Sequence, residues 1–149
     1  MASPIRVLFV CTGNSARSLL AEAVLRQRGG PGFEVHSAGT SPRGVNPLTV
    51  RVLEDAGIAT VDLASKGLDS YLGEPFDHVI TVCDDARQVC PVFPGGAPTR
   101  HWSLVDPAAV EGPEEGRLAA FRETLELIET HIAGFLVEAA AANVRSASS

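Results

Sequence analysis

The sequence of 149 residues lacks the features that define several large classes of protein. It has no excess of basic residues. Its net charge of −6 argues against nucleic acid or an anionic membrane surface as a partner, because both bind basic proteins. It also has no apolar run long enough to span a bilayer, and the run in MASPIRVLFV is too short for a secretion signal. We therefore expect a cytoplasmic protein without a membrane segment.

Cysteine is scarce, and the three residues present are Cys11, Cys83 and Cys90. An odd number of cysteines in a reducing compartment does not indicate a framework of structural disulfides. The four histidines have no metal-ligand spacing with one another or with the cysteines, so no metal site is predicted. The cysteines are then either small packed side chains or reactive thiols.

No repeat, low-complexity linker or shift in composition divides the chain, so we predict a single domain over residues 1–149. Short apolar runs alternate with helical patterns. The predicted strands are 7–11, 33–38, 77–83 and 99–104, and the predicted helices are 18–28, 47–56 and 113–142. A short helix or turn is expected at 65–72, helix is compatible with 83–90, a loop is expected over 91–98, and a frayed tail over 143–149. This alternation predicts a three-layer α/β sandwich with a four-stranded parallel sheet flanked by helices.

The stretch RVLFVCTGNSARSLL carries the strongest functional signal. A short buried strand ends at Cys11, a loop of small residues follows, and a helix begins near Ser18. The free N–H groups of such a loop and of the first helical turn converge on one point, where they bind anions. Gly13 allows close approach of the backbone, and Arg17 offers a bidentate donor to an oxyanion. We expect these donors to depress the pKa of the Cys11 thiol and make it a nucleophilic thiolate.

The segment between Cys83 and Cys90 carries a second signal. Cys11 and Cys83 are both predicted at the carboxyl ends of adjacent central strands, where α/β sheets bind ligands. If the segment is helical, the Cα atoms of Cys83 and Cys90 are about 10.5 Å apart, whereas a disulfide needs roughly 4.4–6.8 Å. The segment then resembles a switch, helical when reduced and looped out when oxidised. In the alternative interpretation, Cys83 is a core residue and Cys90 a loop residue.

The spacing C-x5-R near the N-terminus resembles the phosphate-binding loop of low-molecular-weight protein tyrosine phosphatases. The motifs CTGNSARS, TVCDDARQVCPVFP and HWSLVDPA, with a long C-terminal helix, resemble thioredoxin-coupled arsenate reductases built on that fold. The similarity runs from Val7 to about Phe135. It implies an oxidoreductase of arsenic detoxification that reduces arsenate to arsenite and whose loop also accepts phosphate or sulfate. The oxyanion-binding residues that it implies are Thr12, Gly13, Asn14, Ser15, Ala16, Arg17 and Ser18.

The resemblance also implies an order of events among the thiols. Cys11 would attack arsenate, and Cys83 would attack the Cys11–arsenic adduct and release arsenite. Cys90 would then attack Cys83, and the Cys83–Cys90 disulfide would be presented to thioredoxin. Ser18 would donate to the Cys11 thiolate, and Asn14 would hold the unusual backbone of the loop. No bound cofactor is implied; thioredoxin is the external reductant, although glutaredoxin and mycothiol systems use the same type of loop.

Asp106 follows the last predicted strand, and the resemblance places such a residue over the anion loop as general acid for the leaving oxygen. The alternative is a plain Asp-Pro turn at Asp106-Pro107. Ala108 and Ala109 stand where tyrosine phosphatases of this fold carry aromatic residues that wall a phosphotyrosine slot. This departure favours the reductase over the phosphatase.

Some reductases of this family bind potassium near the loop, through residues that match Asn14, Glu22 and Ser37, with Ser65 as a further match. The carboxylate that those members carry slightly later is absent here, where Lys66 occurs. We therefore predict no metal site. Glu22 is expected to be either a surface residue of its helix or a structural hydrogen-bond acceptor.

Two other functions remain open. A low-molecular-weight protein tyrosine phosphatase would need Cys11, Arg17 and Asp106 but neither of the other cysteines. A non-catalytic oxyanion sensor or redox-regulated binding domain would keep the loop and the disulfide switch without turnover. In each case a monomer is expected.

Overall fold

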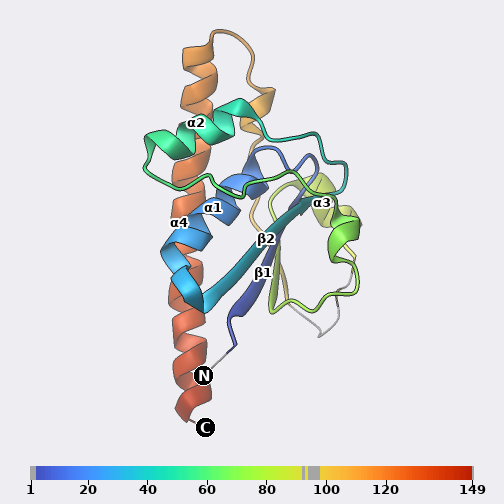
Figure 1. The fold of residues 1–149 in the computed structure, drawn as a ribbon, viewed down its shortest axis with the longest axis vertical. Coiled ribbons are helices and arrows are strands. Elements are labelled where there is room, and N and C mark those ends of the chain that lie inside the picture. Colours follow the sequence, from blue (N-terminus) through green and yellow to red (C-terminus); the bar gives the residue numbers. More distant parts are fainter. Residues whose placement is uncertain (1–2, 92, 94–97, 149) are drawn as a thin grey trace.

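The computed structural model describes residues 3–91, 93 and 98–148, and over these residues strands and helices alternate as predicted (Figure 1). The strands are β1 (Ile5–Cys11), β2 (Phe33–Gly39), β3 (His78–Thr81) and β4 (Thr99–His101). The α-helices are α1 (Arg17–Gly29), α2 (Pro47–Asp55), α3 (Asp84–Val89) and α4 (Glu114–Ser148). The 3-10 helices are η1 (Gly30–Gly32), η2 (Leu68–Tyr71) and η3 (Pro107–Ala109).

The sheet places β1 at its centre. Its strand order is β2-β1-β3-β4, and β1 runs parallel to β2 on one side and to β3 on the other. Val7, Leu8, Phe9 and Val10 are completely buried, although their side chains alternate between the two faces of the sheet. Both faces are therefore covered, which is typical of parallel sheets. The predicted four-stranded parallel α/β fold is confirmed.

The two faces of the sheet are covered by different segments. On one face, Phe9 of β1 packs on Trp102 at a centroid distance of 5.6 Å, and Trp102 stacks on His131 of α4 at 4.8 Å. On the other face, the guanidinium of Arg6 lies 4.7 Å from the ring centroid of Phe76, which follows η2 in the chain. The sheet is thus the middle layer of three.

Helix α4 presents the apolar stripe that the sequence predicts. The buried residues of this stripe are Leu118, Phe121, Leu125, Ile128, Ile132 and Phe135. The helix continues to Ser148, so the predicted end near Ala142 is too early, and 143–148 continue the helix instead of leaving it. Residues 142–148 contain neither proline nor glycine, the residues that usually stop a helix. No helix within the described ranges combines the length and hydrophobicity needed to cross a membrane.

Strands β3 and β4 are shorter than the predicted 77–83 and 99–104. The chain nevertheless stays beside β1 after β3 ends, because the N–H of Val82 donates to the carbonyl of Val10 at 2.9 Å. Cys83 then leads directly into α3. In the predicted loop over 91–98, residues 92 and 94–97 lie outside the described residues, as does Ser149 in the predicted tail.

Candidate active site

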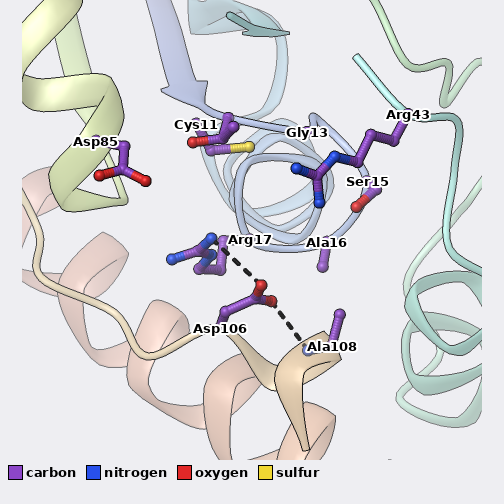
Figure 2. A pocket seen from close by; sticks show the side chains of 10 residues that line it. Cys11, Gly13, Ser15, Ala16, Arg17, Arg43, Asp85, Asp106 and Ala108 are labelled. Carbon is purple, nitrogen blue, oxygen red and sulfur yellow. Dashed lines mark hydrogen bonds and ion pairs between the residues drawn. The ribbon is translucent and has the colours of Figure 1, made fainter. Parts of the chain in front are cut away.

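A cavity of about 160 Å³ lies at the carboxyl end of β1 (Figure 2). Strand β1 ends at Cys11, and α1 begins at Arg17 after a loop over 12–16. The residue before the helix, Ala16, gives no side-chain cap, so the N–H groups of the first turn remain free to face an anion. The residues that line the cavity are Cys11, Thr12, Gly13, Ser15, Ala16, Arg17, Arg43, Asp85, Asp106 and Ala108.

A chain of hydrogen bonds behind the cavity ends at the Cys11 sulfur. The N–H of Lys66 donates to Asn14 Oδ1 at 2.7 Å, which fixes the orientation of the amide. Asn14 Nδ2 therefore donates to Ser18 Oγ at 2.8 Å and to Ser37 Oγ at 2.9 Å. Ser18 Oγ lies 2.7 Å from Cys11 Sγ, and when Cys11 is a thiolate the sulfur has no proton, so Ser18 is then the donor.

Asn14 also contributes its backbone. Its N–H donates to Cys11 Sγ at 3.1 Å, and its φ of 45° lies in the left-handed region. Asparagine is among the few residues other than glycine that adopt this region readily. The buried amide and the left-handed turn together point one backbone donor at the thiol.

The pKa of the Cys11 thiol is raised, which corrects the predicted depression. Burial is the largest cause of the rise, and the nearby Cys83 adds to it. The hydrogen bonds from Ser18 and Asn14 act in the opposite direction and lower the pKa. The prediction failed because the sequence shows which donors surround Cys11 but does not show how completely Cys11 is buried. The residue is only 2% exposed.

We predict that Ser18→Ala raises the pKa of Cys11 further, because it removes a hydrogen bond that stabilises the thiolate. The thiolate forms as the pH rises through the pKa, so the midpoint of Cys11 alkylation moves to higher pH. At neutral pH the alkylation rate falls by about tenfold. Alkylation by iodoacetamide, resolved by peptide mapping across pH, measures the change.

The control for this prediction is Ser70→Ala in η2, where the same change is made at an exposed position. It should leave the midpoint unchanged. A midpoint that stays in place or falls in Ser18→Ala would show that Ser18 accepts from the thiol instead of donating to the thiolate.

Asp106 and Arg17 lie next to each other in the lining of the cavity, and Figure 2 draws their contact as a dashed line. Arg17 Nη2 lies 3.7 Å from Asp106 Oδ2, and Arg17 Nη1 donates to the carbonyl of Leu104 at 3.0 Å. Asp106 Oδ1 accepts the N–H of Ala108 at 2.9 Å and so caps η3. Asp106 therefore lines the cavity and also makes a turn, which were alternatives at the level of sequence.

Cys83 lies at the same edge of the sheet as Cys11. Its Sγ is 3.3 Å from Thr12 Oγ1, in the loop that follows Cys11. Cys83 and Cys90 stand immediately before and after α3, and all three cysteines are free thiols. Burial raises the pKa of the Cys90 thiol. With α3 formed, the Cys83 and Cys90 Cα atoms are about 10.5 Å apart, so a disulfide between them requires α3 to unwind.

Helix α3 is held at its first residue. Asp84 Oδ1 lies 2.8 Å from His101 Nε2, and His101 Nδ1 lies 2.7 Å from Thr81 Oγ1. His101 therefore has a structural role, joining α3 to β3. Unwinding from the Cys90 end leaves this contact intact, whereas unwinding from the Cys83 end breaks it.

Glu22 is buried at 1% exposed, so the interpretation as a surface residue is wrong. It is a structural acceptor, as the second interpretation held: Ser37 donates to Oε1, and Arg26 Nη2 donates to Oε2 at 2.6 Å. The ammonium of Lys66 lies 3.6 Å from Oε1. Two side-chain cations thus already neutralise Glu22, and Asn14 Oδ1 is occupied by a backbone donor. These residues do not fit a potassium site.

Within residues 3–91, 93 and 98–148, no three histidine, cysteine, aspartate or glutamate side chains are grouped to hold a metal ion.

Glu22 is buried because the whole middle of α1 is buried, with α1 in contact with β1, β2, α2 and α4.

Sequence analysis missed two charged residues that line the cavity, Arg43 and Asp85. Arg43 lies in the loop over 40–46 that follows β2, and Asp85 lies in the first turn of α3 after β3. Both segments leave the carboxyl ends of strands adjacent to β1. That topological position was the signal that could have identified them, because such loops meet at one edge of a parallel sheet.

Comparison with known proteins places this geometry among relatives of known activity. The sequence profile of the family described as low molecular weight phosphotyrosine protein phosphatase matches residues 6–146. The chain is 37% identical over 129 residues to an arsenate reductase of Halalkalibacterium halodurans, covering 87% of this chain and 93% of that protein. It is 36% identical over 129 residues to an arsenate reductase of Bacillus subtilis, with the same coverage of 87% and 93%.

A solved structure gives a similar result. The thioredoxin-dependent arsenate reductase of Corynebacterium glutamicum superposes with a TM-score of 0.71 at 32% identity. The match covers 93% of this chain but 63% of that one, so this chain spans less than two thirds of its length.

Proposed function

The chain belongs to the low molecular weight phosphotyrosine protein phosphatase family, and on that premise we propose how it works as an arsenate reductase. It is an enzyme that reduces arsenate to arsenite, like its relatives at 36% and 37% identity. The single observation that carries this assignment to individual residues is the position of Cys83, 3.3 Å from Thr12 in the anion loop. A phosphatase needs one thiol at this edge of the sheet, whereas a reductase needs a second thiol within reach of the first.

Arsenate binds in the cavity through the free N–H groups of the loop and of the first turn of α1, together with Arg17. The Cys11 thiolate attacks As(V), and an oxygen leaves as water with a proton from Asp106. Ser18 and the N–H of Asn14 stabilise the thiolate before this step. Because Cys11 is buried at the bottom of the cavity, arsenate in the loop is held against its sulfur.

The reduction itself is a transfer of two electrons from thiols. The Cys83 thiolate attacks Cys11 Sγ, the S–As bond breaks, and its electron pair goes to arsenic, which leaves as As(III) in arsenite. A Cys11–Cys83 disulfide remains. The Cys90 thiolate then attacks Cys83 Sγ, and Cys11 departs as a thiolate into the hydrogen bonds that stabilise it.

Helix α3 must open for the last exchange, and its short length of 6 residues favours this. An isolated helix of that length has little stability of its own, so it depends on its tertiary contacts. The unwound segment then carries a Cys83–Cys90 disulfide, which we propose is reduced by the dithiol of thioredoxin. We place the enzyme in the cytoplasm, where thiols are kept reduced between turnovers, and expect it to act as a monomer without a bound cofactor.

Phosphate ester hydrolysis is the second candidate, favoured by the position of Asp106 opposite Arg17 at the cavity. Phosphorus(V) is not reduced by thiols, so a phosphate ester would undergo hydrolysis only. Ala108 lines the cavity where an aromatic side chain would be needed to hold an aryl group. We therefore expect aryl phosphate hydrolysis to be slow in comparison with arsenate reduction.

The test measures both activities on one preparation. Reduced protein is mixed with arsenate, thioredoxin, thioredoxin reductase and NADPH, and arsenite is quantified; hydrolysis of p-nitrophenyl phosphate is followed in parallel. We expect stoichiometric NADPH oxidation and arsenite production, with hydrolysis slower by at least about 100-fold, since an unwalled slot loses orientation of the ester. Hydrolysis without any arsenite would assign the protein to the phosphatases instead.

A further inference from the structure

Arg43 is a second guanidinium at the mouth of the cavity. Figure 2 shows its side chain reaching from its own loop toward the space between Cys11 and Asp106, with Arg17 approaching from a different side. Arg43 and Arg17 both line the cavity, together with the carboxylates of Asp85 and Asp106. None of the steps above uses Arg43.

The loop that carries Arg43 is fixed to the anion loop by a series of backbone hydrogen bonds. The N–H groups of Ser41, Arg43 and Asn46 donate to carbonyls of the anion loop, at 2.8, 2.9 and 3.0 Å respectively. The side chain also lies close to the loop, since a Cβ placed on Gly13 would be 3.4 Å from Arg43 Cδ. The guanidinium is therefore held near the cavity by its backbone, although the residue is exposed.

The two arginines differ in how they are engaged. Arg17 is bound to the carbonyl of Leu104 and faces Asp106. Among the described residues, no carboxylate lies within ion-pair distance of the Arg43 guanidinium. Arg87 and Arg117 also have no ion-pair partner there, but they do not line the cavity. Arg43 is thus available to an incoming anion.

The balance of charges around the cavity makes the guanidinium of Arg43 important for attracting an anion. Two guanidinium groups and two carboxylates cancel, whereas without Arg43 the lining would carry one net negative charge. The chain as a whole has a net charge of −6 and repels anions at long range. An anion therefore depends on local positive charge at the mouth, and Arg43 supplies half of it.

We propose that Arg43 is a second oxyanion-binding residue, which draws the anion into the cavity and contacts the oxygens that face away from α1. For arsenate as the substrate this rests on the proposed function, but the contact applies to any tetrahedral oxyanion in the loop. Arg43 acts on binding and not on the electron transfer, because the bonds that break and form join Cys11, Cys83 and arsenic.

The test is Arg43→Gln, compared with Arg51→Gln, which removes the same charge from an exposed position on α2 outside the cavity lining. The affinity for inorganic phosphate is measured by isothermal titration calorimetry, and KM and kcat are measured for arsenate. In Arg43→Gln we expect phosphate affinity to fall and KM to rise by about five- to tenfold, with kcat within about twofold. Arg51→Gln should match the wild type, and Arg43→Lys should recover much of the affinity.

The dependence of phosphate affinity on salt concentration distinguishes an electrostatic role of Arg43 from a purely structural one, which salt would not change. Because Arg43 is exposed, the difference between Arg43→Gln and wild type should shrink as ionic strength rises from roughly 0.05 to 0.5 M. Equal phosphate affinity in Arg43→Gln and Arg51→Gln would overturn the proposal. Weaker phosphate binding in Arg43→Gln, in a protein that forms no arsenite, would uphold Arg43 as an anion ligand while removing arsenate reduction as the function.

Discussion

Cys11→Ser is expected to abolish arsenite formation, lowering turnover by at least about 10⁴-fold. The surroundings of Cys11 activate a thiol and not an alcohol. Ser18 and the N–H of Asn14 stabilise an anion at the sulfur position. No histidine is among the described residues that line the cavity, so none is there to take a proton from a hydroxyl. A serine there stays protonated at neutral pH and cannot attack arsenic.

The same variant should still bind anions, which separates lost chemistry from lost folding. The loop N–H groups, Arg17 and Arg43 are unchanged, so inorganic phosphate should bind within about threefold of wild type, as expected for a substitution of sulfur by oxygen. Turnover is measured by arsenite production with thioredoxin, and binding by calorimetry. Substantial turnover in Cys11→Ser would exclude Cys11 as the nucleophile and leave Cys83, at the same sheet edge, as the first thiol to test.

Cys90→Ser is expected to release one arsenite per molecule and then stop with a Cys11–Cys83 disulfide. Cys83 Sγ contacts Thr12, the residue after Cys11, so we expect these two thiols to react while α3 is in place. Only Cys90, at the far end of α3, is then expected to carry the disulfide away from the buried edge. With thioredoxin alone, multiple turnover should fall by at least about 100-fold, because the remaining disulfide is buried and poorly accessible to an external thiol. Cys83→Ser should bind arsenate and produce no disulfide.

The measurement is to quench reduced protein after arsenate addition and map the disulfide-linked peptides by mass spectrometry. Wild type should accumulate a Cys83–Cys90 disulfide and lose the circular dichroism of α3 as it forms. Full cycling of Cys90→Ser with thioredoxin alone contradicts the relay. Cycling that appears only when a small thiol is added identifies that thiol, and not thioredoxin, as able to resolve Cys11.

Local pattern was sufficient to predict the main elements of this fold. The apolar run before Cys11 and the small-residue loop after it predicted β1 and the anion loop. The alternation of steps of three and four in the last helix predicted which side chains of α4 are buried. Such patterns can be recognised in a sequence because a strand or helix repeats its geometry every few residues, so residues on its buried side recur at a fixed spacing.

The sequence predicted some residues of the site and not others. Cys11, Arg17 and Asp106 were identified from a motif and from strand ends, and all three line the cavity. Arg43 and Asp85 line it equally. Arg43 belongs to none of the motifs, and Asp85 lies within TVCDDARQVCPVFP, where the sequence drew attention only to the cysteines. Arg43 comes from the loop after β2 and Asp85 from the first turn of α3. The sequence does not specify which side chains of such segments turn toward the anion loop.

The sequence by itself thus determined the order of strands and helices and the placement of a nucleophilic thiol at the end of a central strand. Only the tertiary structure decided the electrostatic state of that thiol and of its surroundings. Glu22 is buried and forms an ion pair with Lys66, which comes from a distant segment of the chain. Cys11 is so deeply buried that its pKa rises despite the hydrogen-bond donors around it. The reason is physical: secondary structure follows from contacts between near neighbours in the chain, whereas burial and charge depend on groups brought together from distant segments.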